Sequence, residues 1–100
     1  MPPSPRPEEI EAAILAALGE RGEGRTVGPT DVARALAGDH PDGWGPLMPP
    51  IRRAAVRLMK AGRLVILRKG RPVDPDDFKG VYRLGLPGAE PLSRRGEGQG

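Results

Sequence analysis

Apolar residues recur at helical spacing in two stretches of the chain. In the first they fall at positions i, i+3, i+4, i+7 and i+8, which places on one face Ile10, Ala13, Ile14, Ala17 and Leu18. The same spacing returns further along the chain in Ile51, Ala54, Ala55, Leu58 and Met59. Each stretch therefore predicts an amphipathic helix that buries one face.

Proline and glycine residues suggest where the helices begin and end. The first helix is predicted to begin near Pro7, where the missing N–H is not needed, and to end at Gly19 or Gly22. A shorter second helix is predicted over residues 31–37, with Thr30 as its N-cap.

The third helix is predicted to follow a turn at residues 39–43. A proline restricts the residue before it to extended backbone, so Pro49 is expected to be non-helical and Pro50 to take the first helical position. Ala61-Gly62 is expected to end this helix.

The remaining apolar stretches favour β-strands. Residues 25–27 are predicted to form a short edge strand and residues 63–68 a longer one. In residues 81–86, the apolar positions Tyr82, Leu84 and Leu86 alternate with Arg83 and Gly85. This segment is therefore predicted to pair with residues 63–68 as a hairpin with a long tip at 69–80. Three helices and a C-terminal hairpin predict a mainly helical α+β fold, the winged helix-turn-helix.

Composition bounds this fold to one small domain. Of the 100 residues, 37% are hydrophobic, which is enough for one modest core, and we assign the domain to residues 8–86. Residues 1–7 and 87–100 are rich in proline, glycine and charge and are predicted to be disordered tails. The chain has no cysteine, and acidic residues precede its first apolar stretch where a signal peptide carries positive charge; a cytoplasmic protein without a membrane segment is expected.

Basic charge is concentrated in one segment. Residues 51–71 hold 8 of the 16 basic residues and none of the 13 acidic ones, so no acidic neighbour is available there to pair with them. A nucleic-acid surface requires such segregation, and a solvated helix face is the ordinary alternative. The candidate nucleic-acid-binding residues are Arg52, Arg53, Arg57 and Lys60 on the third helix and Lys69 and Arg71 on the hairpin.

The hairpin is the weaker half of this predicted surface. Asp74, Asp76 and Asp77 follow Arg71 closely and would be repelled by DNA. These carboxylates lack the ligand number and spacing of a calcium loop, so a turn with Pro72 and Pro75 is the preferred interpretation, and no metal site is predicted.

Four segments together resemble a known family. They are G-P-T-D-V-A-R-A-L at 28–36, W-G-P-L-M-P-P-I-R-R-A-A-V-R-L at 44–58, A-G-R-L at 61–64 and K-G-R-P-V-D-P-D-D-F-K-G-V-Y-R-L at 69–84. This combination resembles a family of small bacterial winged-helix proteins labelled as a domain of unknown function. The family tends to have arginine where this chain has Gly45, and proline where it has Val81. The resemblance implies the fold and assigns no activity.

No catalytic residue or cofactor is predicted. His40 is the only histidine and lies in the proline- and glycine-rich turn, so it is interpreted as a surface residue, and neither a triad nor a histidine metal site can be assembled. Trp44 and Tyr82 are interpreted as core anchors. A binding module is therefore expected rather than an enzyme, and no small-molecule substrate is evident.

The leading hypothesis is DNA binding with the third helix in the major groove, as in a transcriptional regulator. So small a domain makes few base contacts, so a homodimer or a partner is expected to supply specificity. Two alternatives remain open: a protein-interaction winged helix that docks on an acidic partner, and RNA or ribosome association, against which the scarcity of exposed aromatic residues argues.

Overall fold

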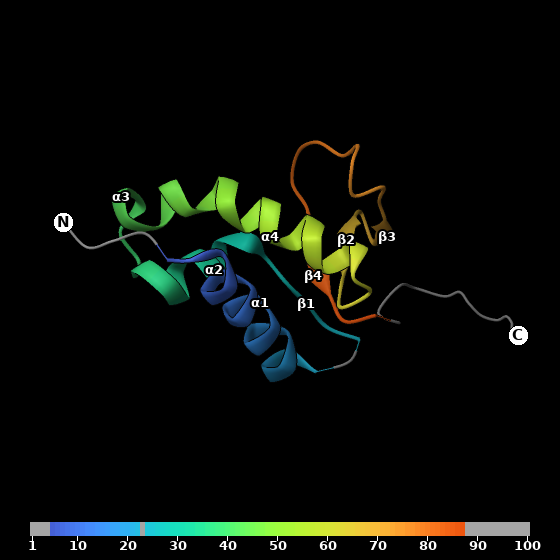
Figure 1. Cartoon of the computed structure of the whole chain (residues 1–100), viewed down its shortest axis with the longest axis horizontal. Coiled ribbons are helices and arrows are strands. Elements are labelled where there is room, and N and C mark those ends of the chain that lie inside the picture. The colour runs from blue at the N-terminus through green and yellow to red at the C-terminus, as the bar shows by residue number, and fades with distance from the viewer. Residues whose placement is uncertain (1–4, 23, 88–100) are drawn as a thin grey trace, which may run out of the picture.

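The computed structural model describes residues 5–22 and 24–87 and shows a mainly helical α+β fold (Figure 1). Its elements in chain order are α1 (Pro7–Arg21), β1 (Thr26–Val27), α2 (Pro29–Ala37), α3 (Pro41–Trp44), the 3-10 turn η1 (Gly45–Leu47), α4 (Met48–Lys60), β2 (Val65–Arg68), β3 (Arg71–Pro72) and β4 (Arg83–Gly85). Three main helices and a small antiparallel sheet are consistent with a winged-helix layout. Of the predicted tails, residues 1–4 and 88–100 lie outside the described residues.

The two apolar stripes form the centre of the core. Ile10, Ile14 and Leu18 of α1 are buried against α4, which contributes four buried residues: Ile51, Ala54, Ala55 and Leu58. Both predicted helical faces are confirmed, with Ala13, Ala17 and Met59 only half-buried at the margins. No helix in the described segments is both long and apolar enough to cross a lipid bilayer.

The start of α2 differs from the prediction. The helix begins at Pro29, and its N-cap is Gly28 rather than Thr30. The Gly28 N–H donates a hydrogen bond to the Asp31 carboxylate at 3.1 Å, which satisfies a backbone donor at the helix start. A Cβ at residue 28 would lie 3.2 Å from the Arg83 guanidinium. The cap thus lies two residues before Thr30, the residue that the sequence pattern favoured. The end of the Arg83 side chain would have to shift slightly to admit a Cβ at residue 28.

The start of α4 was also predicted wrongly. Residues 39–43 were expected to be a turn, but α3 begins at Pro41 and runs through η1 into α4 at Met48. Pro49 and Pro50 both lie in the first turn of α4, where backbone N–H groups need no intrahelical acceptor. The restriction on a residue before proline is a preference, and the continuous helical path overrides it here.

The sheet has the strand order β1-β4-β2-β3, and every neighbouring pair is antiparallel. The predicted edge strand β1 and the predicted pairing of β2 with β4 are confirmed. The prediction missed β3, which pairs with β2 through a tight turn at Lys69 and Gly70. Both turn residues have positive φ, 53° and 80°, as a type I′ hairpin turn requires. This turn lies at the opposite end of α4 from α3 (Figure 1).

Candidate nucleic-acid interface

The six predicted binding residues occupy two separate places. Arg52, Arg53, Arg57 and Lys60 lie on α4, whereas Lys69 and Arg71 flank the tip of the β2–β3 turn. Five of the six side chains are exposed and Arg52 is half-buried. Their contacts show that the four cations of α4 differ in what they do.

Arg52 holds the β3–β4 loop against α4. Its guanidinium carbon lies 3.8 Å from the centre of the Phe78 ring, and its Nη2 donates a hydrogen bond to the Phe78 carbonyl oxygen. The same guanidinium carbon lies 6.0 Å from the centre of the Tyr82 ring. Since its charge faces two aromatic rings and its Nη2 is bonded within the fold, Arg52 is a structural residue in this conformation.

Arg57 and Lys60 are paired with carboxylates. Arg57 Nε lies 2.8 Å from Glu11 Oε2 of α1, and Lys60 Nζ lies 2.7 Å from Asp76 Oδ1 of the β3–β4 loop. The expectation that these cations have no acidic neighbour holds along the segment but is wrong in space. The partners come from elements that the sequence does not place beside α4.

Arg53 is the cation of α4 that remains available. Its side chain is exposed, and no hydrogen bond or ion pair to it is formed by any of residues 5–22 and 24–87. At 100° per residue it lies opposite the buried Ile51, Ala54 and Ala55, at the outward face of the helix. This face also carries Lys60.

The tip of the β2–β3 hairpin is cationic and unpaired. Within the part of the chain that the structure describes, neither Lys69 nor Arg71 forms an ion pair. The neighbouring Arg68 is committed to the fold, because its Nε donates to the Val81 carbonyl oxygen at 3.1 Å. Residues 74–77 of the β3–β4 loop form the predicted turn, in which the Asp74 carboxylate accepts a hydrogen bond from the Asp76 N–H.

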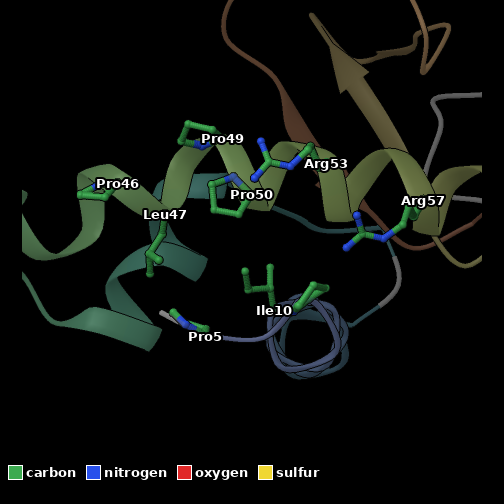
Figure 2. A pocket seen from close by; sticks show the side chains of 9 residues that line it. Pro5, Ile10, Pro46, Leu47, Pro49, Pro50, Arg53 and Arg57 are labelled. Atoms are coloured by element: carbon green, nitrogen blue, oxygen red, sulfur yellow. The ribbon is translucent and has the colours of Figure 1, made fainter. Parts of the chain in front are cut away.

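A groove of about 460 Å³ runs between the start of α1 and the start of α4 (Figure 2). Ile10 points into it from α1, while Pro49, Pro50 and Arg53 line it from α4. Arg57 closes one end, where its guanidinium lies close to α1. The groove therefore adjoins the exposed cation of α4, and the sequence pattern gave no sign of it.

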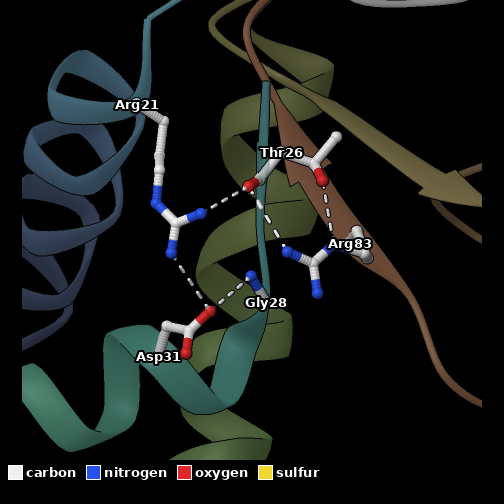
Figure 3. Close-up of polar contacts among 5 residues, drawn as sticks. All are labelled: Arg21, Thr26, Gly28, Asp31 and Arg83. Carbon is white, nitrogen blue, oxygen red and sulfur yellow. Dashed lines mark hydrogen bonds and ion pairs between the residues drawn. The ribbon is translucent and has the colours of Figure 1, made fainter. Parts of the chain in front are cut away.

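Apart from the groove, a cluster of polar contacts joins α1, β1, α2 and β4 (Figure 3). Arg83 Nε donates to Thr26 Oγ1 at 2.8 Å, and Arg83 Nη2 donates to the Thr26 carbonyl oxygen at 3.3 Å. Arg21 reaches the same carbonyl oxygen at 3.5 Å and lies 3.8 Å from the Asp31 carboxylate. These arginines tie the edge strand β1 to its neighbours, so they belong to the scaffold of the site.

Comparison with known proteins places this arrangement in a family. The family model described as Protein of unknown function (DUF3253) matches residues 7–87, which contain every element from α1 to β4. The chain belongs to this family. The resemblance to a domain of unknown function is confirmed in this form. A search of the curated proteins finds no match.

The structure shows where the two departures from the family's usual residues, Gly45 and Val81, lie in this DUF3253 chain. Gly45 is half-buried at the start of η1, directly after Trp44. Val81 is 86% exposed and lies two residues before β4, outside the strand that was predicted to begin there. Trp44 itself is half-buried against the core, and its Nε1 donates to the Asp39 carbonyl oxygen at 3.1 Å, as a core anchor does.

Tyr82 lies inside the DUF3253 core. It is 7% exposed, and its ring meets Phe78 edge-on at 5.3 Å. Among the described residues no hydrogen bond to its hydroxyl is formed. Burial raises the pKa of Tyr82, and the nearby positive charge of Arg52 acts in the opposite direction.

This raised pKa predicts a loss of stability at alkaline pH. The folded protein keeps the Tyr82 proton when the unfolded chain, whose tyrosine pKa is about 10, releases it. The contribution of the Tyr82 proton to the free energy of unfolding is thus fully present below about pH 10. It is lost as the pH rises through the folded-state pKa of Tyr82. Urea unfolding from pH 8 to 11 should show this decline in the wild type and a shallower one in Tyr82→Phe, since Tyr82 is the only tyrosine. Equal declines in both proteins would mean that other groups cause it.

Proposed function

We propose that this DUF3253 chain is a winged-helix module that binds duplex DNA through the outward face of α4 and the β2–β3 tip. One observation carries the proposal: Arg53 is exposed on that face without a protein partner in the described segments. A B-form major groove admits an α-helix, and arginine is the commonest side chain that reads guanine there. Lys69 and Arg71 lie beyond the end of α4, where they suit contacts to phosphates.

The two ion pairs on this face leave room for DNA contacts. The Arg57 and Glu11 side chains are 46% and 30% exposed, and those of Lys60 and Asp76 are 52% and 66% exposed. Exposed pairs contribute only about 0–1 kcal/mol, so a phosphate can replace a carboxylate at little cost. Arg57 and Lys60 therefore serve as secondary phosphate contacts, while Arg52 keeps its structural role.

The deciding experiment measures fluorescence anisotropy of a labelled mixed-sequence duplex over a salt series. Arg53→Gln should weaken binding about tenfold and reduce the slope of log K against log salt by about one unit. Arg25→Gln is the matched control, because Arg25 is exposed beside β1, at the sheet edge opposite β3. Wild-type binding no tighter than about 10⁻⁴ M, or equal losses in both variants, would contradict the proposal.

Removing the carboxylate partner of Arg57 should have the opposite effect. Glu11→Gln frees the guanidinium and removes a negative charge beside the incoming phosphates, so duplex affinity should rise about two- to fivefold at low salt. Glu20→Gln changes the net charge equally at the exposed far end of α1 and should raise affinity less. The same anisotropy assay tests this, and equal gains in the two variants would leave Glu11 without a special role.

The second candidate function is docking on an acidic protein. It is favoured by the fact that Arg57 and Lys60 already hold carboxylates. Salt-sensitive co-purification with an acidic protein, with no affinity for duplex DNA, would select it, whereas tighter binding to structured RNA of equal length would select an RNA partner. A homodimer remains our expectation for specific DNA sites, because a single domain offers few base contacts.

We further propose that the protein acts in the cytoplasm by binding rather than catalysis. His40 is the only histidine, and its side chain is 77% exposed. Its Nδ1 accepts the Asp42 N–H at the start of α3, which is a capping role. His40→Ala should therefore leave DNA affinity unchanged.

A further inference from the structure

The groove between α1 and α4 has rigid apolar walls. Pro7 of α1 and Pro46, Pro49 and Pro50 of η1 and α4 surround it, and the pyrrolidine rings fix their own φ angles. The buried residues Ile10 and Leu47 also line it. A volume of about 460 Å³ falls within the range of small-molecule sites, and preformed walls reduce the ordering that a ligand requires.

The charges on this groove are of one sign. Arg53 and Arg57 line it, and none of the described residues that line it is acidic. Glu11 engages only Nε of Arg57, so the Nη groups of Arg57 and the whole Arg53 guanidinium have no hydrogen-bond acceptor in the described segments. Guanidinium groups bind a carboxylate through paired hydrogen bonds, and apolar walls beside them suit an apolar body.

We propose that this groove binds a small organic carboxylate with a compact apolar body, and that such a ligand competes with DNA. The carboxylate accepts hydrogen bonds from Arg53 and from the free Nη groups of Arg57, while the apolar body lies on Ile10 and the proline rings. A ligand held in this way occupies the guanidinium that the duplex needs. The site itself stands on the groove alone, and the competition rests on the proposed DNA binding.

The site is tested by titrating ¹⁵N-labelled protein with 1-naphthoate, followed by amide chemical shifts. The uncharged 1-naphthamide is the matched ligand, because it has nearly the same shape without the charge. We expect saturable shifts at the amides of residues 8–10, 47–48 and 51–57, and binding about tenfold weaker for 1-naphthamide and for Arg53→Gln. Pro49→Ser, which removes an exposed wall, should weaken naphthoate binding, whereas Arg25→Gln should leave it unchanged. Equal affinity for the two ligands, shifts outside the groove or no saturation would overturn the proposed site.

The competition is tested by adding 1-naphthoate to the labelled duplex complex at constant ionic strength. Release of the duplex at concentrations that saturate the groove, with no release by 1-naphthamide, is the expected result. Naphthoate shifts without release from a complex that depends on Arg53 would overturn the competition and leave the site standing. If the wild type binds no duplex at all, the proposed function and the competition both fail, while the titration alone still decides the site.

Discussion

Replacing Arg52 by alanine is expected to lower the free energy of unfolding by about 2–4 kcal/mol, through two lost interactions. The first is the charge-assisted hydrogen bond to the Phe78 carbonyl oxygen, and the second is the contact of the guanidinium with the Phe78 ring at 3.8 Å. Both hold the loop after β3 on α4. The half-buried carbonyl would be left without its donor, which adds a desolvation penalty.

Urea denaturation measures this change, and two further variants separate its causes. Arg52→Lys keeps the positive charge but lacks the planar guanidinium, so it should recover less than half of the lost stability. Arg53→Ala, one residue along the same helix, should change the free energy of unfolding by less than about 0.5 kcal/mol. An Arg52→Ala protein of unchanged stability and reduced duplex affinity would instead make Arg52 part of the binding face.

Leu84→Ala should be at least as damaging, with a loss of about 2–5 kcal/mol. Leu84 is 0% exposed in β4, the strand between β1 and β2, and is paired with Val27 on one side and Ile66 on the other. Truncation leaves a cavity where segments distant in the sequence meet. Since small domains are stable by only about 5–15 kcal/mol, a large share of the total would be lost.

Thermal and urea unfolding of Leu84→Ala should be compared with Leu86→Ala. Leu86 is two residues on, at the same inward alternation, but is only half-buried. Its truncation should remove less apolar contact and cost about 1 kcal/mol. Similar losses in both variants would mean that the burial of Leu84 in the sheet does not determine its contribution.

The three main helices and the β-prone segments that become β1, β2 and β4 could be predicted because their signals are local. Ile10, Ile14 and Leu18 repeat at the helical period, and the buried residues are those that the period selected. Tyr82 and Leu84 likewise alternate inward as expected. Periodicity works here because each element must bury one face on a single core.

The segments that the prediction missed have weak or conflicting local signals. α3 and η1 contain Pro41, Gly43, Gly45 and Pro46, residues that favour turns, and they become helical in a path that leads into α4. β3 has only two residues, one of them Pro72, which an edge strand tolerates. Its pairing depends on the turn at Lys69 and Gly70, in which a lysine adopts the left-handed conformation.

The sequence likewise predicted some features of the candidate site and missed others. The concentration of cations in residues 51–71 was visible in the sequence, and so were the residues that form the outward face of α4. Their partners were not, since Glu11 is 46 residues from Arg57 and Phe78 is 26 residues from Arg52. Only these long-range contacts distinguish the structural Arg52 and the paired Arg57 from the available Arg53.

By itself, then, the sequence determined the amphipathic helices, the β-prone segments and the sign of the charge on α4, because each depends on residue type and short-range spacing. The tertiary structure decided which cations stay available, where Pro46, Pro49 and Pro50 form a wall, and how Gly28 comes to lie against Arg83. Such contacts join segments far apart in the chain, and their geometry is set only when the helices and the sheet pack on a common core.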